Sequence, residues 1–179
     1  TIAGTHGKTT TTSIIAHIFE NLGFAPTVIN GGILNSCNTN AYLGKGDWLV
    51  AEADESDGSF NKLPAHIAVV TNIDPEHMEF YGNFTTLRAA FKAFIEKVPF
   101  YGFAVLCSDH MELKNLSTEI KDRKIITYGE GEEALVRAVN IKPKVNGLAF
   151  DLEVKLASHA GTYKNFFVPM FGKYNVANS

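Results

Sequence analysis

The chain has 179 residues, of which 45% are hydrophobic and 20% are charged, and its formal net charge is -3. This composition suits one folded domain with a sizeable core, and the lack of a Lys/Arg-rich run argues against a nucleic acid or an anionic membrane as a partner. No apolar run approaches the ~20 residues of a membrane span, no signal peptide is evident, and Cys37 and Cys107 form neither a metal-ligand pattern nor a disulfide framework, so we expect a cytoplasmic protein.

The two ends of the chain suggest a piece of a longer protein. Thr1 and Ile2 lead directly into a glycine-rich loop, so the strand that should precede this loop is almost absent, and residues 175–179 resemble the first turn of a helix. A natural protein rarely begins and ends within an element. We therefore expect these residues to come from a larger chain.

Short apolar runs alternate with helical patterns along most of the sequence. The predicted helices are residues 14–22, 84–98 and 111–117. The predicted strands are residues 26–29, 48–51, 67–70, 103–107 and 124–128. Gly23 is expected to cap the first helix, and residues 30–46, rich in Gly and Asn, are predicted to be a loop. The alternation predicts an α/β fold of the P-loop type, with a mostly parallel sheet and helices on both faces.

From about Ala134 the pattern changes. Leu148, Phe150 and Leu152 alternate with polar or small residues, and residues 166–170 form another strand-like run. Alternation of this kind is typical of antiparallel strands with one solvated face. We therefore predict a small antiparallel β subregion over about 134–171, appended to the α/β body.

Residues 4–12, GTHGKTTTT, have the features of a phosphate-binding loop. Gly7, Lys8 and Thr9 match the end of the GxxxxGK[ST] pattern, but its first glycine would fall at Ile2, and Gly4 stands two residues later. The two glycines still bracket a tight turn before a helix N-terminus, where backbone N–H groups bind phosphate. We interpret the loop as a working site, in which the lysine contacts the outer phosphates and the threonine hydroxyl Mg²⁺. The alternative is a glycine turn that caps a helix by chance.

Two polar clusters directly follow predicted strands, where ligands bind in open α/β sheets. In residues 52–57, EADESD, we expect Glu52 to bind Mg²⁺ because it is nearest the apolar run, and the other carboxylates to form a solvated turn. In residues 72–77, NIDPEH, we expect His77 to contact metal or substrate. Near the C-terminus, Asn175 can donate and accept hydrogen bonds at a purine edge, although Asn is also a common helix cap.

Together these stretches resemble the Mur ligase family, the ATP-dependent amide-forming ligases of peptidoglycan synthesis. The matching segments are GTHGKT (4–9), EADESDGSF (52–60), VVTNIDPEHMEFYGNF (69–84), VPFYGFAVLC (98–107) and GKYNVAN (172–178). The displaced glycine is part of the family's version of the loop. The resemblance covers essentially all 179 residues as the central ATP-binding domain, which implies that an N-terminal UDP-sugar domain and a C-terminal domain are absent from this chain.

The resemblance is strongest to the members that add L-alanine to the carboxyl group of UDP-N-acetylmuramate through an acyl phosphate, using ATP and Mg²⁺. It implies a catalytic set of Lys8, Glu52 and His77 and a metal-binding set of Thr9, Glu52 and His77. The implied nucleotide contacts are Gly4, Thr5, His6, Gly7, Lys8, Thr9, Thr10 and Asn175. The 179 residues alone, clipped at both ends, are expected to bind MgATP weakly or not at all and to be inactive.

Other readings stay open at this point. The ligase that recycles murein tripeptide shares the glycine loop and the EADE run. Folylpolyglutamate synthase is a related ligase with the same general design. A different P-loop NTPase would need a further element, such as the base-specificity motif NKxD, and this sequence contains none. A regulatory module without chemistry would need fewer metal ligands than this sequence offers. Several Mur ligases carry a carbamylated lysine near the place of Lys92. We favour a solvated Lys92 paired with Glu96, because Phe91 continues the buried stripe of its helix.

Overall fold

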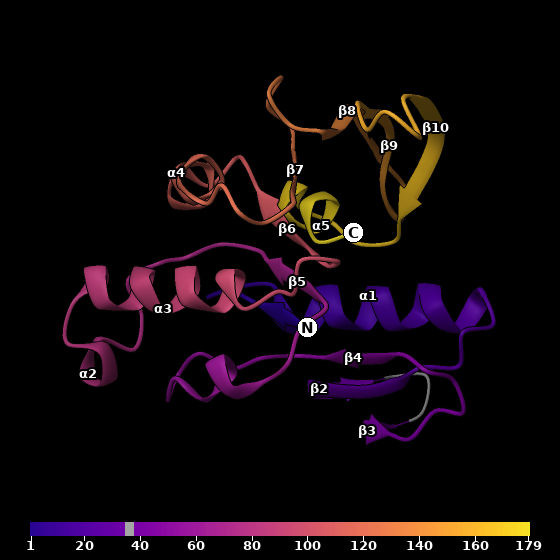
Figure 1. Cartoon of the computed structure of the whole chain (residues 1–179). Coiled ribbons are helices and arrows are strands. Elements are labelled where there is room, and N and C mark those ends of the chain that lie inside the picture. The colour runs from indigo at the N-terminus through magenta and orange to yellow at the C-terminus, as the bar shows by residue number, and fades with distance from the viewer. Residues whose placement is uncertain (35–37) are drawn as a thin grey trace.

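The structure is a computed structural model that describes residues 1–34 and 38–179 (Figure 1). Cys37, considered above, lies outside these ranges. The strands are β1 (Ile2–Ala3), β2 (Thr27–Leu34), β3 (Thr39–Tyr42), β4 (Leu49–Ala51), β5 (Ile67–Val70), β6 (Phe103–Cys107), β7 (Ile125–Gly129), β8 (Val136–Lys144), β9 (Gly147–Val154) and β10 (Gly161–Val168). The helices are α1 (Lys8–Asn21), α2 (Met78–Tyr81), α3 (Phe84–Glu96), α4 (Met111–Glu119) and α5 (Lys173–Ala177), with a 3-10 turn η1 (Ser59–Lys62).

The parallel strands form one continuous surface made from two sheets. One sheet has the order β1-β5-β6-β7-β8-β9-β10 and the other the order β3-β2-β4. Ile2 forms a parallel bridge with Glu52, and the backbone N–H of Ala53 donates to the carbonyl of Ile2 at 2.7 Å. This bridge sets β4 beside β1, so β2, β4, β1, β5, β6 and β7 run parallel to one another. The predicted mostly parallel sheet is confirmed.

Helices cover both faces of this sheet. Neighbouring strand residues point to opposite faces, and Ile2 packs in a cluster with Ala16 of α1, whereas Ala3 packs in the cluster that contains Phe91 and Phe94 of α3. Leu113 and Leu116 of α4 join the second cluster. The two helical layers therefore bury the strands from both sides, which explains why the strand sequences are apolar without alternation.

Strands β8, β9 and β10 form an antiparallel part of the molecule near the C-terminus. β8 pairs with β7 in parallel for two residues and then forms an antiparallel meander with β9 and β10. Leu148, Phe150 and Val168 of this meander share a small core with Val176 of α5. Figure 1 shows α5 lying between the meander and α1 near the C-terminus. The antiparallel addition predicted near the C-terminus is confirmed.

The loop predicted over residues 30–46 is wrong in part. β2 continues to Leu34, and β3 lies within the range predicted as loop. β2 pairs with β3 at Val28, Ile29 and Leu34, and the register shifts between Ile29 and Leu34. Within that shift the backbone N–H of Gly31 donates to Glu52 Oε2, and the glycines allow close approach of other groups. Within the described residues, no helix combines the length and apolarity needed to cross a membrane.

Candidate functional site

Three loops meet at one edge of the sheet because their strands are neighbours. β4, β1 and β5 lie side by side and parallel, so their carboxyl ends open on the same edge. The glycine loop follows β1, the acidic segment follows β4, and residues 71–77 follow β5. The sequence motifs singled out above are thus brought together by topology, at the place where ligands bind in open α/β sheets.

The glycine loop is clamped onto the end of β5. Gly4 has φ +130°, and a Cβ atom there would lie 2.2 Å from the hydroxyl oxygen of Thr71, so a glycine is required. The Thr71 hydroxyl donates to the carbonyl of His6 at 2.6 Å, and the amide of Asn72 donates to the same carbonyl at 2.9 Å. The backbone N–H of His6 donates in return to Asn72 Oδ1 at 2.7 Å. Close packing against Thr71 therefore explains why position 4 is a glycine, although it lies two residues later than the usual pattern places it.

The loop ends at the N-terminus of α1. Gly7 is the N-cap residue with φ +84°, no side chain caps the helix, and its first turn carries no acidic residue. The first N–H groups of a helix have no intrahelical acceptor and carry partial positive charge, which suits an anion. Thr5 is buried and its hydroxyl accepts the backbone N–H of Asp74 at 2.8 Å, while Thr10 is partly buried in the first turn.

Thr9 and Glu52 form a pair of hard oxygen donors at this helix start. The Thr9 hydroxyl donates to Glu52 Oε1 at 3.1 Å, and the backbone N–H of Gly31 donates to Glu52 Oε2 at 2.7 Å. A Cβ atom at Gly31 would lie 2.7 Å from Glu52 Oε1, so a glycine in β2 makes room for the carboxylate. A hydroxyl and an oriented carboxylate beside a phosphate loop are a donor set that fits Mg²⁺.

Glu55 differs from the solvated carboxylate predicted for its position. Its side chain is 1% exposed, and its Oε2 accepts the ammonium of Lys8 at 2.7 Å. The hydroxyl of Tyr81 donates to the backbone carbonyl of Glu55 at 2.5 Å, which turns the segment inward. The prediction is wrong because the counterion comes from the glycine loop, distant in sequence, and nothing among four clustered carboxylates marks the one that pairs.

His77 lies beside Glu55 at the start of α2. Its backbone has φ +56°, its side chain is 31% exposed, and its Nε2 is 3.8 Å from Glu55 Oε1. Ligand atoms of Asp54, Glu55 and His77 all lie within 4.8 Å of one another. Of the three predicted metal ligands, Thr9 and Glu52 therefore contact each other directly. His77 instead lies beside Glu55, which pairs with Lys8 of the glycine loop.

Tyr81 is a neutral hydrogen-bond donor at physiological pH in this arrangement. Burial, followed by the negative charge of Glu55, raises the pKa of Tyr81 to about 12. The phenol therefore keeps its proton across the physiological pH range and holds the carbonyl of Glu55 throughout.

Asn175 is placed close to the glycine loop through Asn178. Asn175 is 8% exposed, and its side-chain amide donates to the carbonyl of Phe171 at 2.7 Å. The amide of Asn178 donates to Asn175 Oδ1 at 3.4 Å, and a Cβ atom at Gly7 would lie 2.6 Å from Asn178 Oδ1. Helix α5 thus packs against the turn of the phosphate loop.

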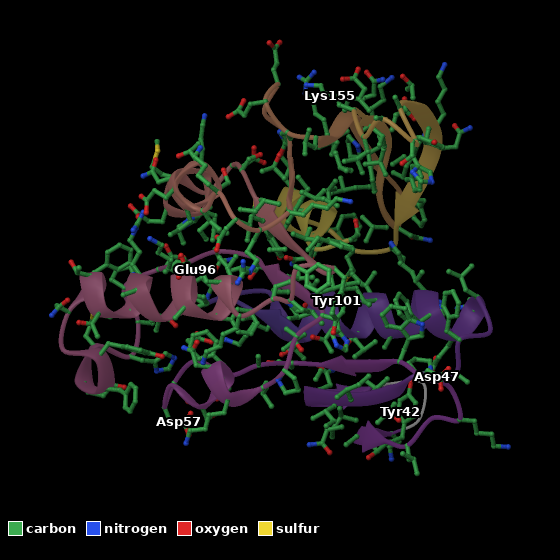
Figure 2. All side chains as sticks on the ribbon, viewed as in Figure 1. Tyr42, Asp47, Asp57, Glu96, Tyr101 and Lys155 are labelled. Atoms are coloured by element: carbon green, nitrogen blue, oxygen red, sulfur yellow. The ribbon has the colours of Figure 1, made fainter. Side chains whose placement is uncertain are left out.

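Lys92 forms the surface pair expected from its spacing. Its ammonium lies 3.8 Å from Glu96 Oε1, one helical turn further along α3, and both side chains are exposed by more than a third. Figure 2 shows Glu96 on this helix.

Comparisons with known proteins show the family and the fold of this chain. The family model described as the Mur ligase middle domain matches residues 2–179. A UDP-N-acetylmuramate–L-alanine ligase of Rhodospirillum centenum is 54% identical over 180 residues, covering 99% of this chain and 37% of that enzyme. The chain therefore spans little more than a third of the length of this curated relative.

Solved structures show the same fold. The UDP-N-acetylmuramate–alanine ligase of Thermotoga maritima matches with a TM-score of 0.81 and 27% identity, over 99% of this chain and 38% of that one. The UDP-N-acetylmuramate:L-alanyl-γ-D-glutamyl-meso-diaminopimelate ligase of Neisseria meningitides matches with a TM-score of 0.80 and 22% identity, over 99% of this chain and 57% of that one. The second likeness shows the fold alone.

Proposed function

Because this chain belongs to the Mur ligase family as its middle domain, we propose that it is the ATP-binding domain of a ligase that joins L-alanine to UDP-N-acetylmuramate. The family is ATP-dependent. The observation that carries the proposal is the Thr9–Glu52 contact of 3.1 Å at the end of a phosphate loop, in a chain 54% identical to a ligase of that name. We further propose that an N-terminal UDP-sugar domain and a C-terminal domain lie outside these residues.

The reaction follows from what an amide bond requires in water. A carboxylate oxygen of UDP-N-acetylmuramate attacks the γ-phosphorus of ATP, the bond to the ADP oxygen breaks, and an acyl phosphate forms. The amine of L-alanine then attacks the acyl carbon, phosphate leaves with the former carboxylate oxygen, and the nitrogen loses a proton. The protein's task in such a transfer is positioning and stabilisation of charge.

Each site residue receives a role in this scheme. Lys8 contacts the outer phosphates, and the N–H groups of residues 7–10 at the start of α1 bind phosphate oxygens, while Thr5 and His6 use their N–H groups to hold the loop on Asn72. Asn175 contacts the adenine. Thr9, Glu52 and His77 would hold Mg²⁺, which when bound neutralises negative charge on the phosphates. Support for the metal comes from the oriented carboxylate of Glu52 and its contact with the Thr9 hydroxyl. The side chains gathered around His77 are Asp54 and Glu55.

The test is MgATP-dependent phosphate release by the full-length ligase, with UDP-N-acetylmuramate and L-alanine, glycine, serine or the murein tripeptide as acceptor. We expect release to require the sugar nucleotide and L-alanine, and Lys8→Ala to lower it ~10²- to 10³-fold. Lys92→Ala, which removes an exposed lysine, is the control and should change the rate less than twofold.

Other outcomes would replace the proposal. Release that requires the tripeptide would indicate the recycling ligase, and release without either substrate would indicate a different NTPase. Ligation of L-alanine by the 179 residues alone would contradict the proposal that domains outside these residues are needed for the reaction.

A further inference from the structure

We propose that Glu55 is a positioning residue that holds the Lys8 ammonium and the His77 imidazole in one arrangement for phosphoryl transfer. This inference rests on the proposed function, because it assigns a task within that reaction. It concerns a side chain that the sequence pattern places among solvated carboxylates and the structure places among the most buried side chains of the chain.

The contacts of Lys8 leave its ammonium oriented. The ammonium has three N–H donors, of which one points to Glu55 Oε2 at 2.7 Å and a second to the carbonyl of Thr5 at 3.4 Å. One donor remains for a phosphate oxygen. A lysine side chain is a point charge on a flexible stem. Partners that bind its ammonium therefore restrict where the last donor points.

The second oxygen of Glu55 faces His77. Among the described residues, Glu55 Oε1 is buried without a hydrogen-bond partner, and it lies 3.8 Å from His77 Nε2. Buried polar atoms are nearly always paired, so an oxygen that lacks a partner and faces an imidazole marks an interaction completed during function. Carboxylates in this position orient histidines that bind ligands.

Glu55 itself is held from behind. Its backbone carbonyl accepts the hydroxyl of Tyr81 at 2.5 Å and the N–H of Gly58 at 3.1 Å. Its neighbour Ala53 is fully buried and tied to β1. The charged groups around its carboxylate are Lys8, His77 and Asp54, so a rigid anion lies between the phosphate loop and the segment after β5.

The first test compares catalysis with binding in the full-length ligase. Glu55→Gln keeps the shape of the side chain and removes its charge. We expect kcat to fall ~10- to 100-fold while ATP binds one equivalent per chain, with a dissociation constant changed less than about threefold. The matched control is Asp57→Asn, in the same acidic segment but pointing away from the site (Figure 2), and it should leave kcat unchanged within twofold.

The second test needs no turnover and uses the 179-residue chain. The ¹⁵N NMR signals of the Lys8 ammonium and the His77 ring, assigned with Lys8→Arg and His77→Asn, should both shift in Glu55→Gln and stay in place in Asp57→Asn. If the ligase proposal fails, this readout still reports on Glu55.

Several results would overturn the role. An unchanged kcat in Glu55→Gln, or Lys8 and His77 signals that do not move, would each contradict it. A loss of ATP-binding stoichiometry in step with kcat would indicate a merely structural residue. A full additional loss when Glu55→Gln is added to Lys8→Ala would show that Glu55 does not act through Lys8. Should Glu55→Gln not fold, Glu55→Asp keeps the charge at shorter reach, and wild-type kcat in that variant would contradict the positional requirement.

Discussion

Lys8 and Glu55 form an ion pair almost removed from solvent, with side chains 13% and 1% exposed. Removing one partner of a buried pair leaves an uncompensated charge, which costs about 3–5 kcal/mol. We therefore expect Lys8→Ala to lower the free energy of unfolding by about that amount, measured by urea denaturation of the chain. Adding Glu55→Gln should restore part of the loss because a neutral amide replaces the unpaired carboxylate. A double variant less stable than Lys8→Ala would contradict this account.

Gly31 tests the placement of Glu52. A Cβ atom at this position would come within 2.7 Å of Glu52 Oε1, and that carboxylate is the end of a flexible side chain that can move away. We expect Gly31→Ala to weaken ATP binding ~10-fold in Mg²⁺ and to leave binding in EDTA unchanged, because only the carboxylate that we propose binds the metal is displaced. Isothermal titration of the full-length ligase under both conditions checks this. Equal weakening in EDTA would show a general distortion of the site.

Tyr81 predicts how stability responds to alkaline pH. Burial raises the pKa of Tyr81 to about 12, whereas an unfolded tyrosine titrates near 10. The folded state then binds more protons than the unfolded state between these values, so the contribution is fully present below about pH 10 and is lost as pH rises toward about 12. Urea denaturation from pH 9 to 12 should show a steeper fall for the wild type than for Tyr81→Phe. Parallel curves would refute the assignment.

At the scale of single residues, the sequence predicts the groups that lie next to a motif and misses those that meet across the fold. Gly4, Lys8, Thr9 and Glu52 are recognisable because each stands at a fixed offset from a strand or helix. Glu55 is not, because its partner lies 47 residues earlier in the chain.

At the scale of elements, α3 begins with a side-chain cap, Asn83. Asn83 Oδ1 accepts the backbone N–H of Thr86 at 2.9 Å at the start of a helix that buries Leu87 and Phe91. We expect Asn83→Ala to destabilise the chain by about 1 kcal/mol, seen as a lower midpoint in urea. Thr85→Ala, on the exposed side of the same turn, is the control, and an equal loss there would exclude the cap as the cause.

Elements with a strong local pattern were predictable, and those defined by pairing were not. The apolar runs of β5 and β6 and the stripe of α3 follow from periodicity alone. The extension of β2 through Asn30, Gly31 and Gly32 does not, because the Gly31 N–H binds the distant Glu52 carboxylate and the glycines allow the approach of Glu52 and Thr9. Low strand propensity was outweighed there by tertiary contacts.

At the scale of the whole molecule, the order β4-β1-β5 gathers three loops, and this order is set by long-range pairing. The sequence predicts a parallel sheet, and the order of its strands comes from the structure. The site therefore depends on the fold as much as on its motifs, and its chemistry is best tested by following an atom through the reaction.

The most direct measurement uses UDP-N-acetylmuramate labelled with ¹⁸O in both carboxylate oxygens, with MgATP, L-alanine and the full-length ligase. Released phosphate is then analysed by mass spectrometry. Activation of the carboxylate through an acyl phosphate predicts one ¹⁸O atom in each phosphate formed, because the leaving group carries a former carboxylate oxygen. Unlabelled phosphate released at the same rate would contradict the account and show that the site hydrolyses ATP with water.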